Sequence, residues 1–231
     1  MRNWDFRAWQ AALGALDSRA AALVGLAAAE RISGCLADGR FQRHGGSTAA
    51  VVRDLLDECW AGILGGDGAA STRTSLPAEQ LARETERYTD LSLRELFHSY
   101  EPFGVDEDET PDDEAVDGVD EFLEEAEPEG AVAMHLDALM AVEEAVVACD
   151  GGPWDGALRC LQITAMAADR YEPGLPGPGL ETQRQAEDLA LVRAAGSAGL
   201  RHLATELRTR ARADASGWQR ATERLDLLHD D

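Results

Sequence analysis

The sequence has no lysine, so its 21 basic residues are all arginines. None of them falls within residues 95–158, although this stretch holds 21 of the 44 aspartates and glutamates. The rest of the chain therefore carries 23 acidic and 21 basic residues, and nearly all of the net charge of −23 comes from one stretch. Such a charge repels nucleic acid and anionic membranes, so we expect neither as a partner.

Signals for export and for membrane insertion are also lacking. The N-terminus carries Arg2, Asp5 and Arg7 and has no apolar signal-peptide region, and no segment approaches roughly 18 uninterrupted apolar residues. The four cysteines form no CxxC pair and lie within apolar helical patterns, which is typical of reduced, buried thiols. Together these absences predict a cytoplasmic protein.

Apolar residues recur at spacings of three and four along most of the chain, and no useful length of sequence alternates as a strand would. The clearest pattern predicts a helix that ends at Gly65 and buries Leu56, Trp60 and Leu64 on one ridge. We therefore predict an all-α fold: a single-domain bundle of about seven to nine helices spanning residues 1–231.

The other helical patterns predict which side chains face inward. Residues 6–16 place Phe6 on an apolar face, and residues 19–36 place Glu30 and Arg31 at the edge of an apolar stripe. The helices after Gly130 and Pro153 include Met140 and Met166 among their inward residues. After Thr182 a long helix follows, in which Gly196 and Gly199 predict either a close helix approach or a kink, and Ser216 is predicted to cap a separate last helix.

Residues 101–129 form an acidic insertion that contains proline and glycine and offers few apolar side chains for burial. This composition predicts a loop or tether. Its carboxylates are the predicted contact surface for a basic protein partner. The partner-binding candidates are Asp106, Glu107, Asp108, Glu109, Asp112, Asp113, Glu114, Asp117, Asp120, Glu121, Glu124 and Glu125.

Partial motifs for catalysis and metal binding are present, but none is complete. Glu95 and His98 have the spacing of half a di-iron site, without a second such pair. The segment 113–124 resembles a calcium-binding loop, but Ala115 replaces a ligand. The glycine-containing segments 43–48 and 195–199 lack the strand that a phosphate loop or nucleophile elbow requires. We therefore predict no catalytic residue, metal or cofactor.

The helical sequence resembles an uncharacterised bacterial all-helical family, domain of unknown function 416. The likeness rests on Leu13 and Leu16, on the AAAERI segment of residues 27–32, on Phe41 and on the VVRDLLDECWAGIL helix. It continues through the helix after Gly130 and the long C-terminal helix. The resemblance implies a helical fold and no particular activity, and the acidic insertion is an addition to the family pattern.

These patterns favour a non-enzymatic, cytoplasmic interaction protein, of an immunity or antitoxin-like kind, that covers a basic partner with an acidic surface. The alternative is a metal-binding or hydrolytic helical-bundle enzyme that uses Asp137, Glu143 and Glu144 together with Glu95 or His98.

Two other uses of the acidic residues stay open. The insertion can serve only as a solvated segment that keeps the protein soluble. It can also dock onto the chain's own basic segment, Arg193–Arg224, which holds seven arginines and three acids. The sequence identifies neither a partner nor an oligomeric state, so a homo-oligomer stays open as well.

Overall fold

The structure is a computed structural model that describes residues 5–38, 48–65, 79–86, 130–150, 154–171 and 180–225. These residues form 8 helices and no strand, which confirms the all-α multi-helix fold. The helices are α1 (Phe6–Gly14), α2 (Ser18–Ile32), the 3-10 helix η1 (Ser33–Ala37), α3 (Thr48–Gly65), a short helix at 79–86, α6 (Gly130–Cys149), α7 (Asp155–Tyr171) and α8 (Leu180–Thr222). The acidic insertion at 101–129 lies outside the described residues.

Helix α2 is the centre of the bundle. Asp17 caps its start by accepting a hydrogen bond from the backbone N–H of Ala20 at 2.8 Å. Every residue from Ala20 to Ile32 is buried, because neighbours cover the helix on all sides. Most of the stretch Ser18–Ala37 lies inside the fold, although by length and composition alone it is apolar enough to cross a membrane.

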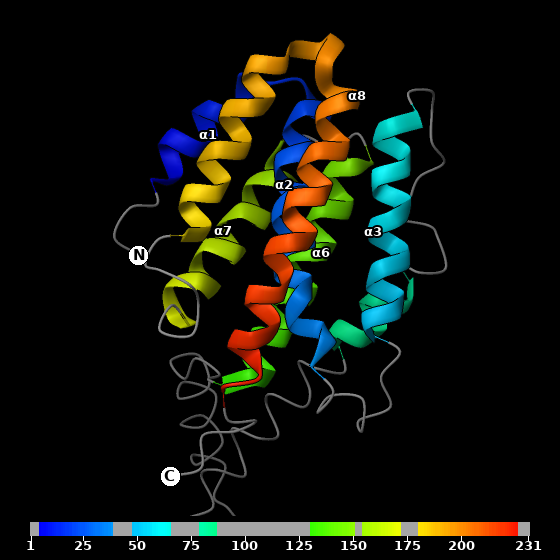
Figure 1. The fold of residues 1–231 in the computed structure, drawn as a ribbon, viewed down its shortest axis with the longest axis vertical. Coiled ribbons are helices and arrows are strands. Elements are labelled where there is room, and N and C mark those ends of the chain that lie inside the picture. The colour runs from blue at the N-terminus through cyan, green and yellow to red at the C-terminus, as the bar shows by residue number, and fades with distance from the viewer. Residues whose placement is uncertain are drawn as a thin grey trace, which may run out of the picture.

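The neighbours of α2 form layers around it (Figure 1). Helix α8 packs on one side of α2, and α6 and α7 pack on the other. Helix α3 flanks the bundle, and α1 lies beside α7. The buried apolar side chains of the described helices join into one core.

Small residues allow these layers to approach closely. A Cβ atom on Gly25 of α2 would lie 3.0 Å from the Cα of Ala157 in α7, and the thiol of Cys160 donates to the Gly25 carbonyl at 3.2 Å. On the other side, a Cβ atom on Gly34 would overlap the backbone carbonyl of Ala215 in α8. The small side chains of α2 and η1 therefore allow α7 and α8 to pack closely against them.

Helix α8 is two helical arms joined at Gly196. This glycine has φ 57° and ψ 179°, a conformation that other residues rarely adopt. The chain turns back there, so that the arm before Gly196 and the arm after it lie side by side (Figure 1). Of the two predicted roles the kink is confirmed at Gly196. Within the part of the chain that the structure describes, nothing beyond its chain neighbours lies within 4 Å of a Cβ built on Gly196, so close packing does not require this glycine.

Several details of the predicted helices and their burial are wrong. Ser216 does not start a new helix, because α8 continues through it to Thr222. Leu64, predicted to be fully buried, is only partly buried against the core. Three residues predicted to face inward are exposed, and two predicted to lie at a stripe edge are buried. The exposed residues are Phe6, Met140 and Met166, and the buried ones are Glu30 and Arg31.

Candidate functional site

Most residues predicted to carry function lie outside the described part of the chain. This applies to the twelve acidic partner-binding candidates between 106 and 125, to Glu95 and His98, and to the calcium-loop-like segment at 113–124. The remaining candidates, Asp137, Glu143 and Glu144, lie on α6 within the described residues, as do the arginines of α8.

Two acids of α6, Glu143 and Glu144, have different partners. Glu143 accepts a hydrogen bond from the hydroxyl of Thr85 at 2.7 Å, whereas Glu144 forms an ion pair with Arg159 at 2.7 Å. Burial raises the pKa of Glu143 despite the bond from Thr85. In the described ranges no three His, Cys, Asp or Glu side chains are grouped as metal ligands would be. The structure thus does not bring Asp137, Glu143 and Glu144 together as a metal site.

A cluster of charges that the sequence reasoning missed lies between α2 and α8. Arg31 donates from Nε to Glu181 at 2.9 Å and from Nη1 to Asp188 at 2.6 Å. All three side chains are at most 3% exposed. Burial works against the charge of Arg31, but Glu181 and Asp188 outweigh it and raise the pKa of Arg31. The guanidinium is therefore a permanent cation that joins the central helix to the first arm of α8.

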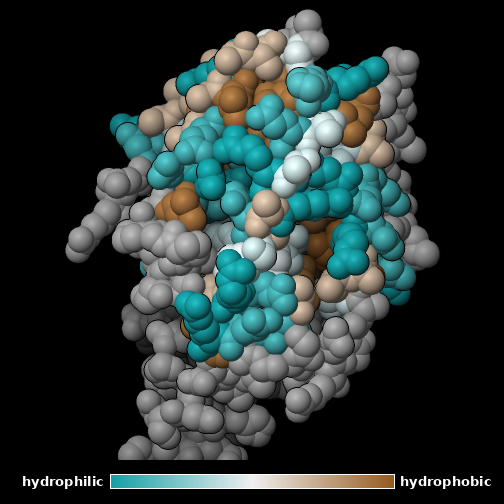
Figure 2. Space-filling view, viewed as in Figure 1, coloured by the Kyte–Doolittle hydropathy of each residue, from teal (hydrophilic) through white to brown (hydrophobic). Residues whose placement is uncertain are grey.

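A second set of charges joins the second arm of α8 to its neighbours. Arg208 and Arg212 both pair with Asp57 of α3, and Arg212 also donates to Glu30 at 2.7 Å. The other oxygen of Glu30 accepts a bond from the indole N–H of Trp60 at 2.8 Å. Arg208 lies over the Trp60 ring, 5.7 Å from its centroid. Figure 2 shows that this face of the body is largely hydrophilic.

The two arms of α8 are also tied to each other by charge. Arg210 of the second arm pairs with Glu187 of the first at 2.8 Å, and Arg184 of the first pairs with Asp214 of the second at 3.0 Å. Hydrogen bonds from Gln183 and Arg184 lower the pKa of Glu187. These pairs cross from arm to arm, so they support the reversal at Gly196.

Two hollows open beside these elements. A cleft of about 110 Å³ is lined by Arg31, Glu181, Arg184, Trp218 and Arg220 among others, and its walls include the ion pairs Arg31–Glu181 and Arg184–Asp214. A shallow groove of about 510 Å³ runs between α1 and α8, lined mainly by alanines, by Trp9 and by Leu189. The first is far smaller than a usual small-molecule site, and the second is open and has few polar groups to orient a ligand.

All four cysteines are free thiols. Cys35, Cys59 and Cys160 are buried, and Cys149 is partly buried. Burial raises the pKa of Cys35 to about 12, so this thiol stays protonated at neutral pH. A protonated, buried thiol is a poor nucleophile, and Cys35 serves as an apolar core residue.

Comparison with known proteins adds no assignment. No known protein family, no curated protein and no solved structure matches this chain. The resemblance to the family domain of unknown function 416 stays a prediction. Function has therefore to be inferred from charge and geometry.

Proposed function

We propose that this chain is a non-enzymatic helical interaction protein of the cytoplasm. It binds a basic protein partner through its acidic stretch, in the manner of an immunity or antitoxin-like inhibitor. The observation that carries this proposal is the pairing of the α8 arginines with acids of the helical body. Arg208, Arg210 and Arg212 bind Asp57, Glu187 and Glu30, and none of these carboxylates belongs to residues 95–158.

This pairing bears on whether the chain's own arginines can bind its acidic stretch. The segment Arg193–Arg224 is the richest in arginine, and self-docking of the acidic stretch would need it. Three of its arginines, Arg208, Arg210 and Arg212, already form ion pairs with carboxylates of α3, the first arm of α8 and α2. This supports an external basic surface, rather than the chain's own arginines, as the counterpart of the 21 acids in residues 95–158.

Binding of this kind depends on long-range attraction. Opposite charges steer two proteins together over a Debye length of about 10 Å at 0.1 M salt, and added salt screens that attraction. Association should therefore weaken as the salt concentration rises. Neutralising acids in the insertion should have the same effect without disturbing the buried core.

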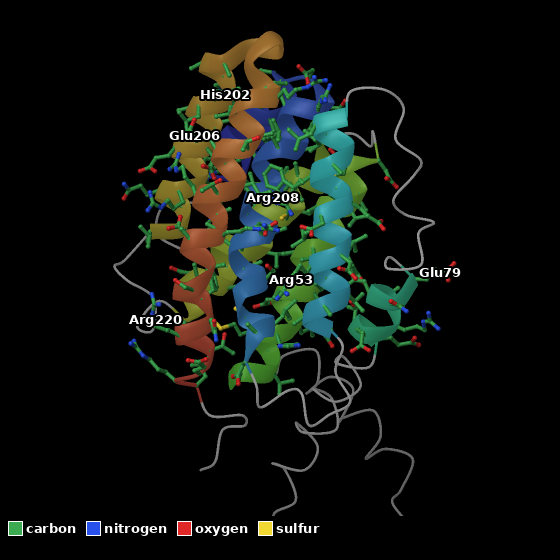
Figure 3. The ribbon with its side chains drawn as sticks, turned by 45° about the vertical axis from the view of Figure 1, so that its right-hand side comes forward. Arg53, Glu79, His202, Glu206, Arg208 and Arg220 are labelled. Atoms are coloured by element: carbon green, nitrogen blue, oxygen red, sulfur yellow. The ribbon has the colours of Figure 1, made fainter. Side chains whose placement is uncertain are left out.

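Two matched variants test the proposal by pull-down from the native host at low and moderate salt. The first replaces Asp106, Glu107, Asp108, Glu109 and Asp112 with their amides. The second makes the same change in charge on the helical body, at the exposed residues Asp54, Glu58, Glu79, Glu86 and Glu206. Glu79 and Glu206 lie at opposite edges of the body, so these charges are dispersed (Figure 3).

We expect the insertion variant to lose a basic protein that the wild type and the body variant both retain. We also expect moderate salt to release that protein from the wild type. Equal recovery by all three proteins would show that the insertion serves solubility alone. Equal loss from both variants would show that total charge matters and the insertion has no special part.

A further inference from the structure

Two of the four cysteines lie together where α3 packs against α6. Cys59 belongs to α3 and is buried in the common core, and Cys149 is the last residue of α6 and packs against that core. The two helices are in contact, and the two side chains share a hydrogen bond. Both thiols are free, so the pair is in its reduced form.

The short helix at 79–86 ties α3 and α6 to each other. The hydroxyl of Thr48, at the start of α3, donates to Glu84 at 2.7 Å, and the hydroxyl of Thr85 donates to Glu143 of α6 at 2.7 Å. Adjacent residues of one helix thus hold both neighbours. Because these bonds do not involve sulfur, the two helices stay side by side whatever the state of the thiols.

Cys149 is the more accessible thiol of the pair. It is partly exposed, whereas Cys59 is 1% exposed. A reagent in solution therefore meets Cys149 first, and Cys59 lies next to it as a second thiol. The hydrogen bond with Cys59, together with burial, raises the pKa of Cys149 well above its usual value. The reactive thiolate is consequently scarce at neutral pH, so the pair reacts slowly and stays reduced in a reducing compartment.

We propose that Cys59 and Cys149 form a reversible disulfide between α3 and α6 when the surroundings become oxidising. The oxidant is a small disulfide such as oxidised glutathione. The thiolate of Cys149 attacks one of its sulfurs, the S–S bond breaks, and one glutathione leaves. The thiolate of Cys59 then attacks the sulfur of Cys149 and releases the second glutathione. The two protons lost by the cysteines end on the two glutathione thiols.

The disulfide would join the helices that flank the acidic insertion in sequence. Helix α3 ends before residue 101 and α6 begins after residue 129, so the bond closes a loop of chain that contains the whole insertion. Closing so long a loop lowers the entropy of the unfolded chain and stabilises the fold. The inference does not depend on the proposed function, because neither cysteine is among the partner-binding candidates.

The other two cysteines supply the controls. Cys35 and Cys160 are completely buried, and the thiol of Cys160 donates to the carbonyl of Gly25 at 3.2 Å. Each cysteine also lies on its own tryptic peptide, because trypsin cleaves after arginine and Arg159 separates Cys149 from Cys160. The four peptides are 32–40, 54–73, 95–159 and 160–170. Peptide masses therefore identify which two thiols are joined.

Redox titration of the folded full-length chain tests the proposal. The protein is equilibrated without air in mixtures of reduced and oxidised glutathione, its remaining thiols are alkylated, and it is digested with trypsin without reduction. We expect the four free thiols to fall to two, with peptide 54–73 joined to peptide 95–159. Excess reduced glutathione should restore all four thiols.

The urea midpoint provides a second measurement. We expect the oxidised wild type to unfold at a urea concentration about 1–2 M higher than the reduced form. Cys149→Ala should form no internal disulfide and show no such shift. Cys35→Ala should form the disulfide and show the same shift as the wild type, because its thiol takes no part in the link.

Three results would overturn the proposal. The first is a wild type that keeps four free thiols in the most oxidising mixture while it remains folded. The second is a disulfide that includes peptide 32–40 or 160–170, or one that joins two chains. The third is a disulfide that forms only in urea, because the fold would then not bring Cys59 and Cys149 together.

Discussion

Arg31 and Glu181 form a two-pronged ion pair across 150 residues of sequence, with Nε and Nη2 of the arginine each 2.9 Å from a different carboxylate oxygen. The planar guanidinium matches the carboxylate, so the pair fixes both the position and the rotation of the first arm of α8 on α2. Asp188, two turns further along the same arm, forms an ion pair with Nη1 of the same guanidinium at 2.6 Å.

Replacing Arg31 with methionine should destabilise the fold by about 3–5 kcal/mol, because Glu181 and Asp188 would then be buried without a cation. Urea unfolding at neutral pH measures the change in the free energy of unfolding. Arg53→Met is the matched control, since Arg53 is exposed on α3 and should change stability by no more than about 0.5 kcal/mol (Figure 3). A loss below about 1 kcal/mol for Arg31→Met would mean that water reaches the cluster.

Gly34→Ala should also be strongly destabilising. An added Cβ atom would overlap the carbonyl oxygen of Ala215, and this backbone atom can move only if α8 moves. We expect a cost of about 3 kcal/mol in a thermal or urea melt. Gly14→Ala is the control, because a Cβ atom there would be 3.7 Å from the Trp154 ring, an ordinary contact. If both substitutions are neutral, η1 and α8 are not in close contact in solution.

Stability should depend on pH through Glu143. Burial raises the pKa of this group above its usual value of 4.5, so the folded state holds the proton more tightly than the unfolded chain does. Ionisation of Glu143 therefore destabilises the fold as pH rises from about 4.5 through the folded pKa. Glu143→Gln keeps an acceptor for Thr85 and removes this cost.

The free energy of unfolding of Glu143→Gln, relative to the wild type, should consequently increase between pH 4 and pH 7. Urea melts at several pH values give this difference, and Glu79→Gln, at an exposed residue, supplies the background for losing a surface carboxylate. A difference that is constant with pH, or that falls as pH rises, would contradict the assigned burial of Glu143.

The helical class could be predicted from sequence because its signal is local. The two apolar rows of α3 place Leu56 and Trp60 in the core whatever the helix packs against. The turn at Gly196 was also visible as a glycine within a helical pattern. Its outcome, a complete reversal of the chain, depends on contacts between the two arms that a local pattern does not contain.

The buried charges were harder to predict because their partners are distant in sequence. Arg31 lies four residues after Ala27 and three after Ala28, so it borders the apolar stripe of α2, but a charge at such a position is usually solvated. The burial of Arg31 is favourable only because Glu181 and Asp188 of α8 form ion pairs with it in the fold. Met140 and Met166 show the reverse, since apolar periodicity does not reveal which residues of an apolar pattern stay exposed in the fold.

The central place of α2 has a consequence for synthesis on the ribosome. Its last residue, Ile32, is translated 98 residues before Gly130, where the first of the helices that cover its far side begins. At about 5–20 residues per second, roughly 5 to 20 s pass before α6 starts to appear. During that time the alanine- and leucine-rich helix at the heart of the bundle lacks most of its cover. The nascent chain thus exposes a helix that is fully buried in the finished fold well before α6, α7 and α8 exist to cover it.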